Sequence, residues 1–219
     1  MIMPRPIVRV LLAATLVVTS STGPATHAND VALSPESIAE QAQTAWEGGA
    51  VMAALELVDQ GIRTHPEAVM LYKLRGDILS TFRDPQEALH DYDKALSGQP
   101  AALDIRWAKW SLLVRWGQDE EAVAELHDIA RVDGNNPLIH LRHAQELRKL
   151  DRLEESLESY KRAVHLMPDL LGWRLALARA RFDVLDYQGA DADLHYVLQH
   201  VPTGSPLELP AKSQLAQLY

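Results

Sequence analysis

The 219-residue sequence contains no cysteine and carries little positive charge. The absence of cysteine excludes disulfide scaffolds, thiol catalysis, cysteine-based zinc sites, iron–sulfur clusters and a lipid-modified N-terminal cysteine. Lysine and arginine number 21 against 30 aspartates and glutamates, for a formal charge of −9. Because nucleic-acid binding requires clustered positive charge, we expect no nucleic-acid partner. The 47% hydrophobic content is nevertheless enough to bury a core.

Sequence motifs of catalysis and metal binding are also missing. There is no phosphate-binding glycine loop, nucleophile elbow or H-E-x-x-H motif. His140, His143 and Glu146 have the spacing of one helix face, but a metal site needs further ligands, and both histidines fall where helix packing is expected. We therefore predict a protein that is not an enzyme, with no catalytic residue, no metal site and no cofactor.

Residues 1–28 have the features of a secretory signal peptide. Arg5 and Arg9 precede a short apolar run, Val10–Val18, and a polar segment that ends in small residues at Ala28. A membrane-spanning helix needs about 20 apolar residues, so this run is too short to be one; an uncleaved anchor is the alternative. We expect a periplasmic or secreted protein with no membrane span after the signal is removed. The avoidance of cysteine fits such an oxidising compartment.

Helix-breaking residues recur along the rest of the chain at a period of 34. The breakers are Pro66, Pro100, Gly134, Pro168 and Pro202. A small residue precedes each breaker by 12 positions: Ala54, Ala88, Ala122, Ser156 and Ala190. A large apolar or aromatic residue precedes each by eight: Val58, Tyr92, Leu126, Tyr160 and Leu194. Five units in the same phase indicate a repeat array.

Each unit contains two apolar-periodic stretches separated by a short polar turn, such as residues 116–119. Ala88, Tyr92 and Ala95 have the spacing of an amphipathic helix. Small residues allow two helices to approach closely. Because a single helix pair cannot bury its own apolar face, we expect the units to stack on one another.

This pattern resembles the tetratricopeptide repeat, a helix–turn–helix unit of about 34 residues. Unit two matches best, at Tyr72, Leu74, Gly76, Leu79, Ala88, Tyr92, Ala95 and Pro100. The resemblance extends over residues 35–204 and implies an all-α, right-handed superhelical solenoid of helix–turn–helix repeats. Two residues depart from the pattern: Trp110 replaces a small residue in unit three and Ser156 replaces alanine in unit four. We expect Trp110 to splay the helices of unit three.

The phase of the repeats predicts the organisation of the whole chain. It comprises the signal peptide 1–28, a lead-in 29–34, repeats 35–68, 69–102, 103–136, 137–170 and 171–204, and a final segment 205–219. Ser34 is the expected N-cap of the first helix. The final segment is either a capping helix or the start of a truncated sixth repeat, because it repeats the leucine, small residue and tyrosine of a first helix.

The charges are divided unequally between the two helices of a unit. Positions 1–14 of the five units together sum to +4, whereas positions 15–34 sum to −14. In tetratricopeptide arrays the first helices line the concave groove, so the resemblance implies a basic groove within an acidic shell.

The resemblance also implies which residues face this groove. The candidates are Lys73, Trp107, Arg115, Gln145, Arg148, Lys149 and Arg179. Arg115, Arg148, Lys149 and Arg179 form a predicted basic wall across units three to five. Because guanidinium groups pair with carboxylates through two hydrogen bonds, we expect the partner to be a protein that contributes an acidic or C-terminal peptide, or an anionic polysaccharide. The alternative is a solvated face whose charges are paired in place.

Two functions are compatible with these features. The first is an exported scaffold that mediates protein–protein interaction, in cell-envelope assembly or polymer export. The alternative is the N-terminal repeat region of a larger exported enzyme or outer-membrane barrel protein. An array that ends at Tyr219, inside a sixth unit, favours this alternative.

Overall fold

The structure is a computed structural model that describes residues 33–81 and 85–219. The predicted signal peptide, residues 1–28, and most of the predicted lead-in lie outside the described residues. Residues Leu33 to Tyr219 form one compact unit, and the described part of it contains helices and no β-strand. No helix in that part is long and apolar enough to cross a membrane.

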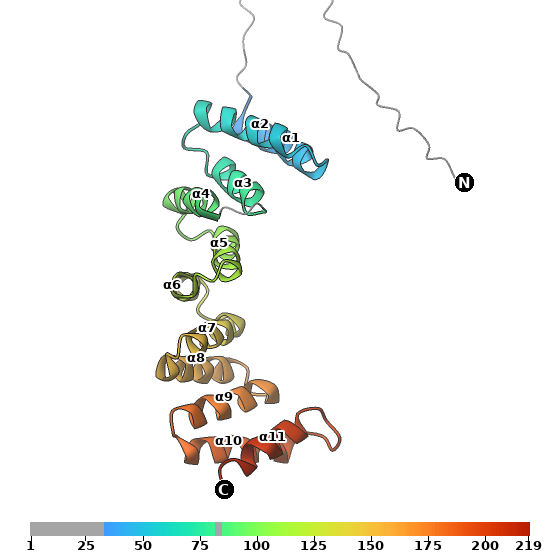
Figure 1. The fold of residues 1–219 in the computed structure, drawn as a ribbon, viewed down its shortest axis with the longest axis vertical. Coiled ribbons are helices and arrows are strands. Elements are labelled where there is room, and N and C mark those ends of the chain that lie inside the picture. The colour runs from blue at the N-terminus through green and yellow to red at the C-terminus, as the bar shows by residue number, and fades with distance from the viewer. Residues whose placement is uncertain (1–32, 82–84) are drawn as a thin grey trace, which may run out of the picture. The chain divides into compact units, whose positions relative to one another are not determined.

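Helices follow one another in pairs along the described chain (Figure 1). They are α1 (Pro35–Glu47), α2 (Val51–Thr64), α3 (Val69–Leu79), α4 (Pro85–Gly98), α5 (Leu103–Arg115), α6 (Asp119–Val132), α7 (Pro137–Lys149), α8 (Leu153–Leu166), α9 (Leu171–Asp183), α10 (Tyr187–His200) and α11 (Glu208–Ala216). The first helices of the five pairs begin at the period expected from the sequence. Each first helix packs against its own second helix, and each second helix packs against the next pair. The predicted all-α fold of stacked helix pairs is confirmed.

Local sequence signals explain where the helices begin. The Ser34 hydroxyl accepts a hydrogen bond from the Ser37 N–H at 3.3 Å, and a proline follows it at the first helical position. The predicted N-cap is therefore confirmed. Asn136 caps α7 in the same way, because its side-chain oxygen accepts a hydrogen bond from the Leu138 N–H at 3.2 Å.

Small residues lie where the two helices of a unit cross. Ala54, Ala88, Ala122, Ser156 and Ala190 are all buried, with at most 1% of their surface exposed. Gly76 allows the same close approach in unit two, because a Cβ atom at this position would lie 2.8 Å from the Tyr92 ring. Tyr92 itself is 1% exposed. The alternation of small and large residues predicted from the repeat thus produces close helix packing.

The two departures from the repeat pattern have different consequences. The buried Ser156 hydroxyl donates a hydrogen bond to the Ala144 carbonyl oxygen at 2.8 Å, which satisfies it within unit four. Trp110 is too large for the crossing point and packs edge-on against Trp107, with the ring centroids 5.3 Å apart. In keeping with the expected splay, α5 and α6 pack less closely than the helices of the other four pairs.

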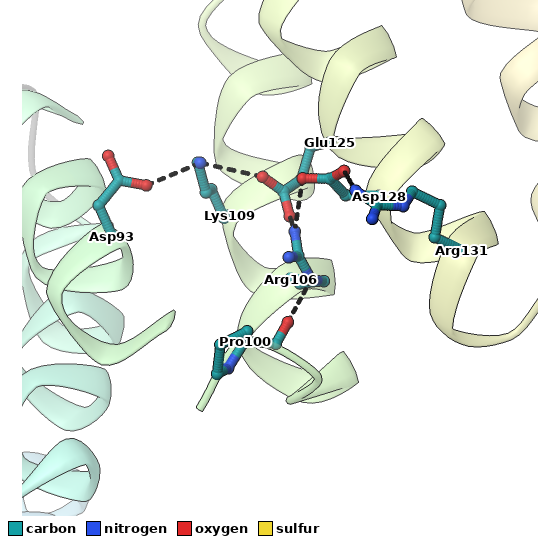
Figure 2. Close-up of polar contacts among 7 residues, drawn as sticks. All are labelled: Asp93, Pro100, Arg106, Lys109, Glu125, Asp128 and Arg131. Atoms are coloured by element: carbon teal, nitrogen blue, oxygen red, sulfur yellow. Dashed lines mark hydrogen bonds and ion pairs between the residues drawn. The ribbon is translucent and has the colours of Figure 1, made fainter. Parts of the chain in front are cut away.

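Ion pairs join the second unit to the third (Figure 2). Lys109 of α5 reaches Asp93 of α4 at 2.7 Å and Glu125 of α6 at 2.9 Å. Glu125 is only 4% exposed and also pairs with Arg106, at 2.5 Å. A buried carboxylate requires such partners, because an uncompensated charge in the interior is strongly destabilising.

The same arrangement joins the first unit to the second, one repeat earlier in the chain. Arg75 of α3 reaches Asp59 of α2 at 2.6 Å and the buried Asp91 of α4 at 2.7 Å. The equivalent residue of unit four is His143, whose Nδ1 lies 3.1 Å from the Ser159 hydroxyl. Cations therefore bridge the junction of units one and two and the junction of units two and three. At the third junction, between units three and four, a histidine has this position.

Helix α11 covers the end of the array. Its Ala211 is fully buried and belongs to a cluster with Leu175 and Ala178 of α9 and Leu194 and Val197 of α10. The segment after α10 thus continues the apolar core beyond the fifth pair.

Candidate binding cleft

A cleft of about 680 Å³ opens among α7, α8 and α9. Its lining consists of Gln145, Arg148, Lys149, Asp151, Leu153, Tyr160 and Asp183. Three of the seven predicted groove residues, Gln145, Arg148 and Lys149, therefore lie in one hollow. Two of these are the basic residues in the last turn of α7, where positive charge is favoured by the helix dipole.

Asp183 of α9 orients two arginines at this cleft. Its two carboxylate oxygens accept hydrogen bonds from Arg148 Nε at 2.9 Å and from Arg179 Nε at 3.1 Å. Within the described part of the chain, the terminal nitrogens of both guanidinium groups donate no hydrogen bond to protein. The arginines are thus held in position while most of their donors remain available.

Tyr160 of α8 contributes a phenol to the lining. The residue is 4% exposed, and among residues 33–81 and 85–219 its hydroxyl has no hydrogen-bond partner. Burial raises the pKa of Tyr160, so the hydroxyl keeps its proton near neutral pH. The cleft therefore contains a phenolic donor beside the Arg148 guanidinium.

Acidic residues neutralise part of the positive charge around the cleft. Lys149 Nζ donates a hydrogen bond to the buried Glu146 at 2.6 Å, and Asp183 takes one nitrogen from each arginine. The alternative in which charges are paired in place is thus observed for these cations. The terminal guanidinium nitrogens and the Tyr160 hydroxyl are among the cleft donors that have no protein partner in the described chain.

The structure does not bring the other predicted groove residues into this cleft. Lys73 pairs with Asp77 on its own helix at 2.7 Å, and Trp107 packs against Trp110. Arg115 is exposed and has no ion-pair partner among the described residues. Arg179 is not part of the lining, but it donates a hydrogen bond to the lining residue Asp183. The predicted wall is therefore concentrated in units four and five.

The expectation of a broadly basic groove requires a correction. Three first-helix arginines are directed at carboxylates on second helices: Arg75 at Asp91, Arg106 at Glu125, and Arg174 at Asp193. These three carboxylates are at most 5% exposed. Since they neutralise the arginines inside each unit, the charge sum over the first helices overstates the positive charge available to a ligand.

Sequence reasoning missed two residues that shape the cleft. The repeat pattern indicates a packing role alone for Tyr160 and does not single out Asp183. Asp183 occupies the thirteenth position of its unit, as Lys149 does in unit four. Because Lys149 was predicted to face the groove from this position, the same position in unit five could have identified Asp183.

The histidines considered as metal ligands form hydrogen bonds of other kinds. His140 Nε2 lies 2.9 Å from the Gly134 carbonyl oxygen, and His143 Nδ1 bonds to Ser159. In the described part of the chain, no group of three or more histidine, aspartate or glutamate side chains is arranged to hold a metal ion.

Comparison with known proteins identifies the fold through structure and not through sequence. No protein-family model matches this sequence, and no curated protein matches it. YrrB, described as a tetratricopeptide-repeat protein with an unusual peptide-binding site, aligns with a TM-score of 0.60 and 18% identity, covering 80% of this chain and 90% of its own.

Two further solved structures support the same assignment. A tetratricopeptide-repeat protein from Parabacteroides merdae aligns with a TM-score of 0.59 and 19% identity, over 84% of this chain and 72% of its own. MamA from Desulfovibrio magneticus RS-1 aligns with a TM-score of 0.56 and 18% identity, over 75% of this chain and 93% of its own. The chain therefore has the tetratricopeptide-repeat fold.

Proposed function

We propose that this chain is an exported scaffold that binds a partner protein through the cleft among α7, α8 and α9. Its role would lie in cell-envelope assembly or polymer export. The observation that carries the proposal is the pair of arginines oriented by Asp183, whose terminal nitrogens are unused within the described chain. A stacked-helix array supports such a role because it offers an extended surface for another chain.

The proposed export depends on the N-terminal sequence. Residues 1–28 combine a positive start, a short apolar run and a small residue at the expected cleavage point. The lack of cysteine agrees with an oxidising compartment. We therefore place the mature protein in the periplasm or outside the cell.

The proposed ligand is an acidic or C-terminal peptide segment of the partner. Two guanidinium groups favour carboxylate, because each offers a planar pair of donors that matches its two oxygens. The peptide-binding site named for YrrB motivates a peptide here in preference to an anionic polysaccharide.

Capture of partners from the cell envelope tests the proposal. The tagged full-length protein would be expressed in its native host and recovered from the envelope fraction, where its N-terminus is expected at Asn29. Arg148→Glu combined with Arg179→Glu should abolish the crosslinked partners identified by mass spectrometry, because both variant side chains repel a carboxylate.

A control variant with the same change in net charge is available outside the cleft. Arg63 and Arg162 are exposed and have no ion pair with the described residues. Arg63→Glu combined with Arg162→Glu should retain the captured partners. The circular-dichroism spectrum should be unchanged in both double variants, and capture that survives the cleft substitutions would refute the proposed site.

A further inference from the structure

Units two and four carry a tyrosine at the same position of the repeat, and the two tyrosines differ in what they bind. In unit two the Tyr92 hydroxyl donates a hydrogen bond to the Asp77 carboxylate at 2.9 Å. Lys73 donates to the other oxygen of the same carboxylate at 2.7 Å. Unit two therefore contains a complete site in which one carboxylate is held by a phenol and a cation.

Unit four contains the donors of this site without the carboxylate. Tyr160 lies two repeats after Tyr92, and Gln145 stands in the position of Asp77. The Gln145 side chain is neutral and the residue is exposed. The Tyr160 hydroxyl has no hydrogen-bond partner among the described residues, and Tyr160 lines the cleft, so the hydroxyl is available to a ligand.

Asp151 and Asp183 are the acidic residues of the cleft lining, and neither forms a hydrogen bond with the Tyr160 hydroxyl among the described residues. Asp183 accepts hydrogen bonds from Arg148 and Arg179 through its two oxygens. Glu146 accepts a hydrogen bond from Lys149. In the described chain, therefore, no carboxylate has the place at Tyr160 that Asp77 has at Tyr92.

We infer that unit four receives from its partner the carboxylate that unit two supplies itself in Asp77. The ligand carboxylate would accept one hydrogen bond from the Tyr160 hydroxyl and others from the terminal nitrogens of Arg148. Arg148 then supplies the cation that Lys73 supplies in unit two, although the two residues occupy different positions on their first helices. This inference rests on the proposed function and specifies the chemistry of the same cleft.

Two kinds of peptide carboxylate have this chemistry, namely an Asp or Glu side chain and a free C-terminus. Three synthetic peptides separate them: acetyl-Gly-Glu-Gly-amide, acetyl-Gly-Gly-Gly with a free carboxylate, and acetyl-Gly-Gln-Gly-amide as the neutral control. Digalacturonate serves as the polysaccharide fragment. Binding at concentrations up to about 10 mM is followed by NMR, through the side-chain N–H signals of Arg148 and Arg179.

The decisive variant is Tyr160→Phe, which removes only the hydroxyl. At least one carboxylate peptide should shift the arginine signals of the unmodified protein, and the neutral peptide should not. Tyr160→Phe should weaken that binding about tenfold, as expected for loss of a hydrogen bond to a charged group. Its thermal stability should not fall, because the hydroxyl has no partner to lose in the described chain.

Tyr92→Phe provides the matched control in unit two. It removes a hydroxyl that is bonded to Asp77, so it should lower the melting temperature and leave peptide binding unchanged. The opposite responses of the two variants distinguish a ligand-binding phenol from a structural one.

Several results would overturn the inference. They are undiminished peptide binding by Tyr160→Phe, an equal response to the neutral peptide, binding of digalacturonate alone, and no response to any carboxylate peptide. If partner capture still requires Arg148 and Arg179 in any of these cases, the proposed function stands and only the carboxylate site fails. If capture survives the double arginine substitution, the proposed function itself fails.

Discussion

Leu185 occupies a turn position whose backbone conformation is unfavourable for a residue with a side chain. In the four units where it is described, the fifteenth residue forms the turn between the two helices and has a positive φ: 80° at Gly49, 69° at Gly117 and 58° at Asp151 in the first three of these. In unit five this residue is Leu185, with φ 66° and a side chain that is 69% exposed. The left-handed conformation places the Cβ of an L-residue too close to the following carbonyl oxygen.

Leu185→Gly should therefore stabilise the protein by up to about 1 kcal/mol, because glycine adopts this conformation without a steric penalty. Little apolar burial is lost, since the leucine is mostly exposed. The midpoint of urea unfolding measures the change. Gly117→Ala is the reciprocal control and should destabilise by a similar amount. A lower midpoint for Leu185→Gly would show that the leucine contributes contacts that outweigh its backbone strain.

At the scale of the helices, the packing of each pair depends on small residues at the crossing point. Ala88 of α4 is fully buried, and its carbonyl oxygen would lie 3.3 Å from a Cβ atom on Gly76 of α3. The two helices approach so closely that no larger side chain fits between them. Trp110 in unit three shows the alternative, in which a large residue is accommodated by a looser pair.

Ala88→Leu should lower the stability of the array by about 1–3 kcal/mol, the usual cost of overpacking a closely packed site. Thermal unfolding followed by circular dichroism measures the loss. Lys94→Leu on the same helix is the matched control, because Lys94 is exposed and leucine has a similar helix propensity. An unchanged melting temperature for Ala88→Leu would contradict the assigned crossing point.

At the scale of the whole molecule, the junctions between successive units differ in chemistry. Arg75 and Lys109 bridge the first two junctions through carboxylates on both sides. At the junction of units three and four, His143 faces Ser159 and lies 6.4 Å from the His127 ring, measured between centroids. Burial lowers the pKa of His143 to about 4, with smaller contributions from His127, His140 and Arg152; Glu155 opposes them.

This shift makes the stability of the array sensitive to acid. An unfolded histidine binds a proton below about pH 6.5, whereas folded His143 does so only near pH 4. The unfolded state therefore binds more protons between these values, and the free energy of unfolding should fall as the pH decreases from about 6.5 to 4. Urea unfolding at pH 7.5, 5.5 and 4.5 should show a smaller loss for His143→Gln than for the unmodified protein.

The exposed His165 provides the control for this pH dependence. His165→Gln should leave the loss of stability on acidification unchanged, because the His165 side chain is exposed to solvent. Identical pH profiles for His143→Gln and the unmodified protein would contradict a role for the third junction.

The helical architecture could be predicted from sequence because its determinants are local and periodic. The alternation of Ala88, Tyr92 and Ala95, repeated at the period of the array, requires two packed helices in each unit. Solenoid contacts occur mainly between neighbours in the chain, so the correct phase of the repeat was enough to place the small residues at the crossings. Ser34 was identified as an N-cap for the same reason, since capping acts within one turn.

The binding cleft was only partly predictable, because it depends on which charges find partners across different helices. The sequence placed Gln145, Arg148 and Lys149 on one helix face. It contained no sign that Arg75, Arg106 and Arg174 are neutralised by buried carboxylates. Charge pairing depends on distances of a few ångströms between helices, and the tertiary packing determines those distances.

Composition and periodicity therefore decided the fold of this protein and excluded cysteine chemistry. Three-dimensional packing decided that Asp183 orients Arg148 and Arg179, and that Tyr160 is left without an acceptor in the described chain. The physical reason is that burial of a helix face repeats along the sequence, whereas satisfaction of a polar group depends on one particular neighbour.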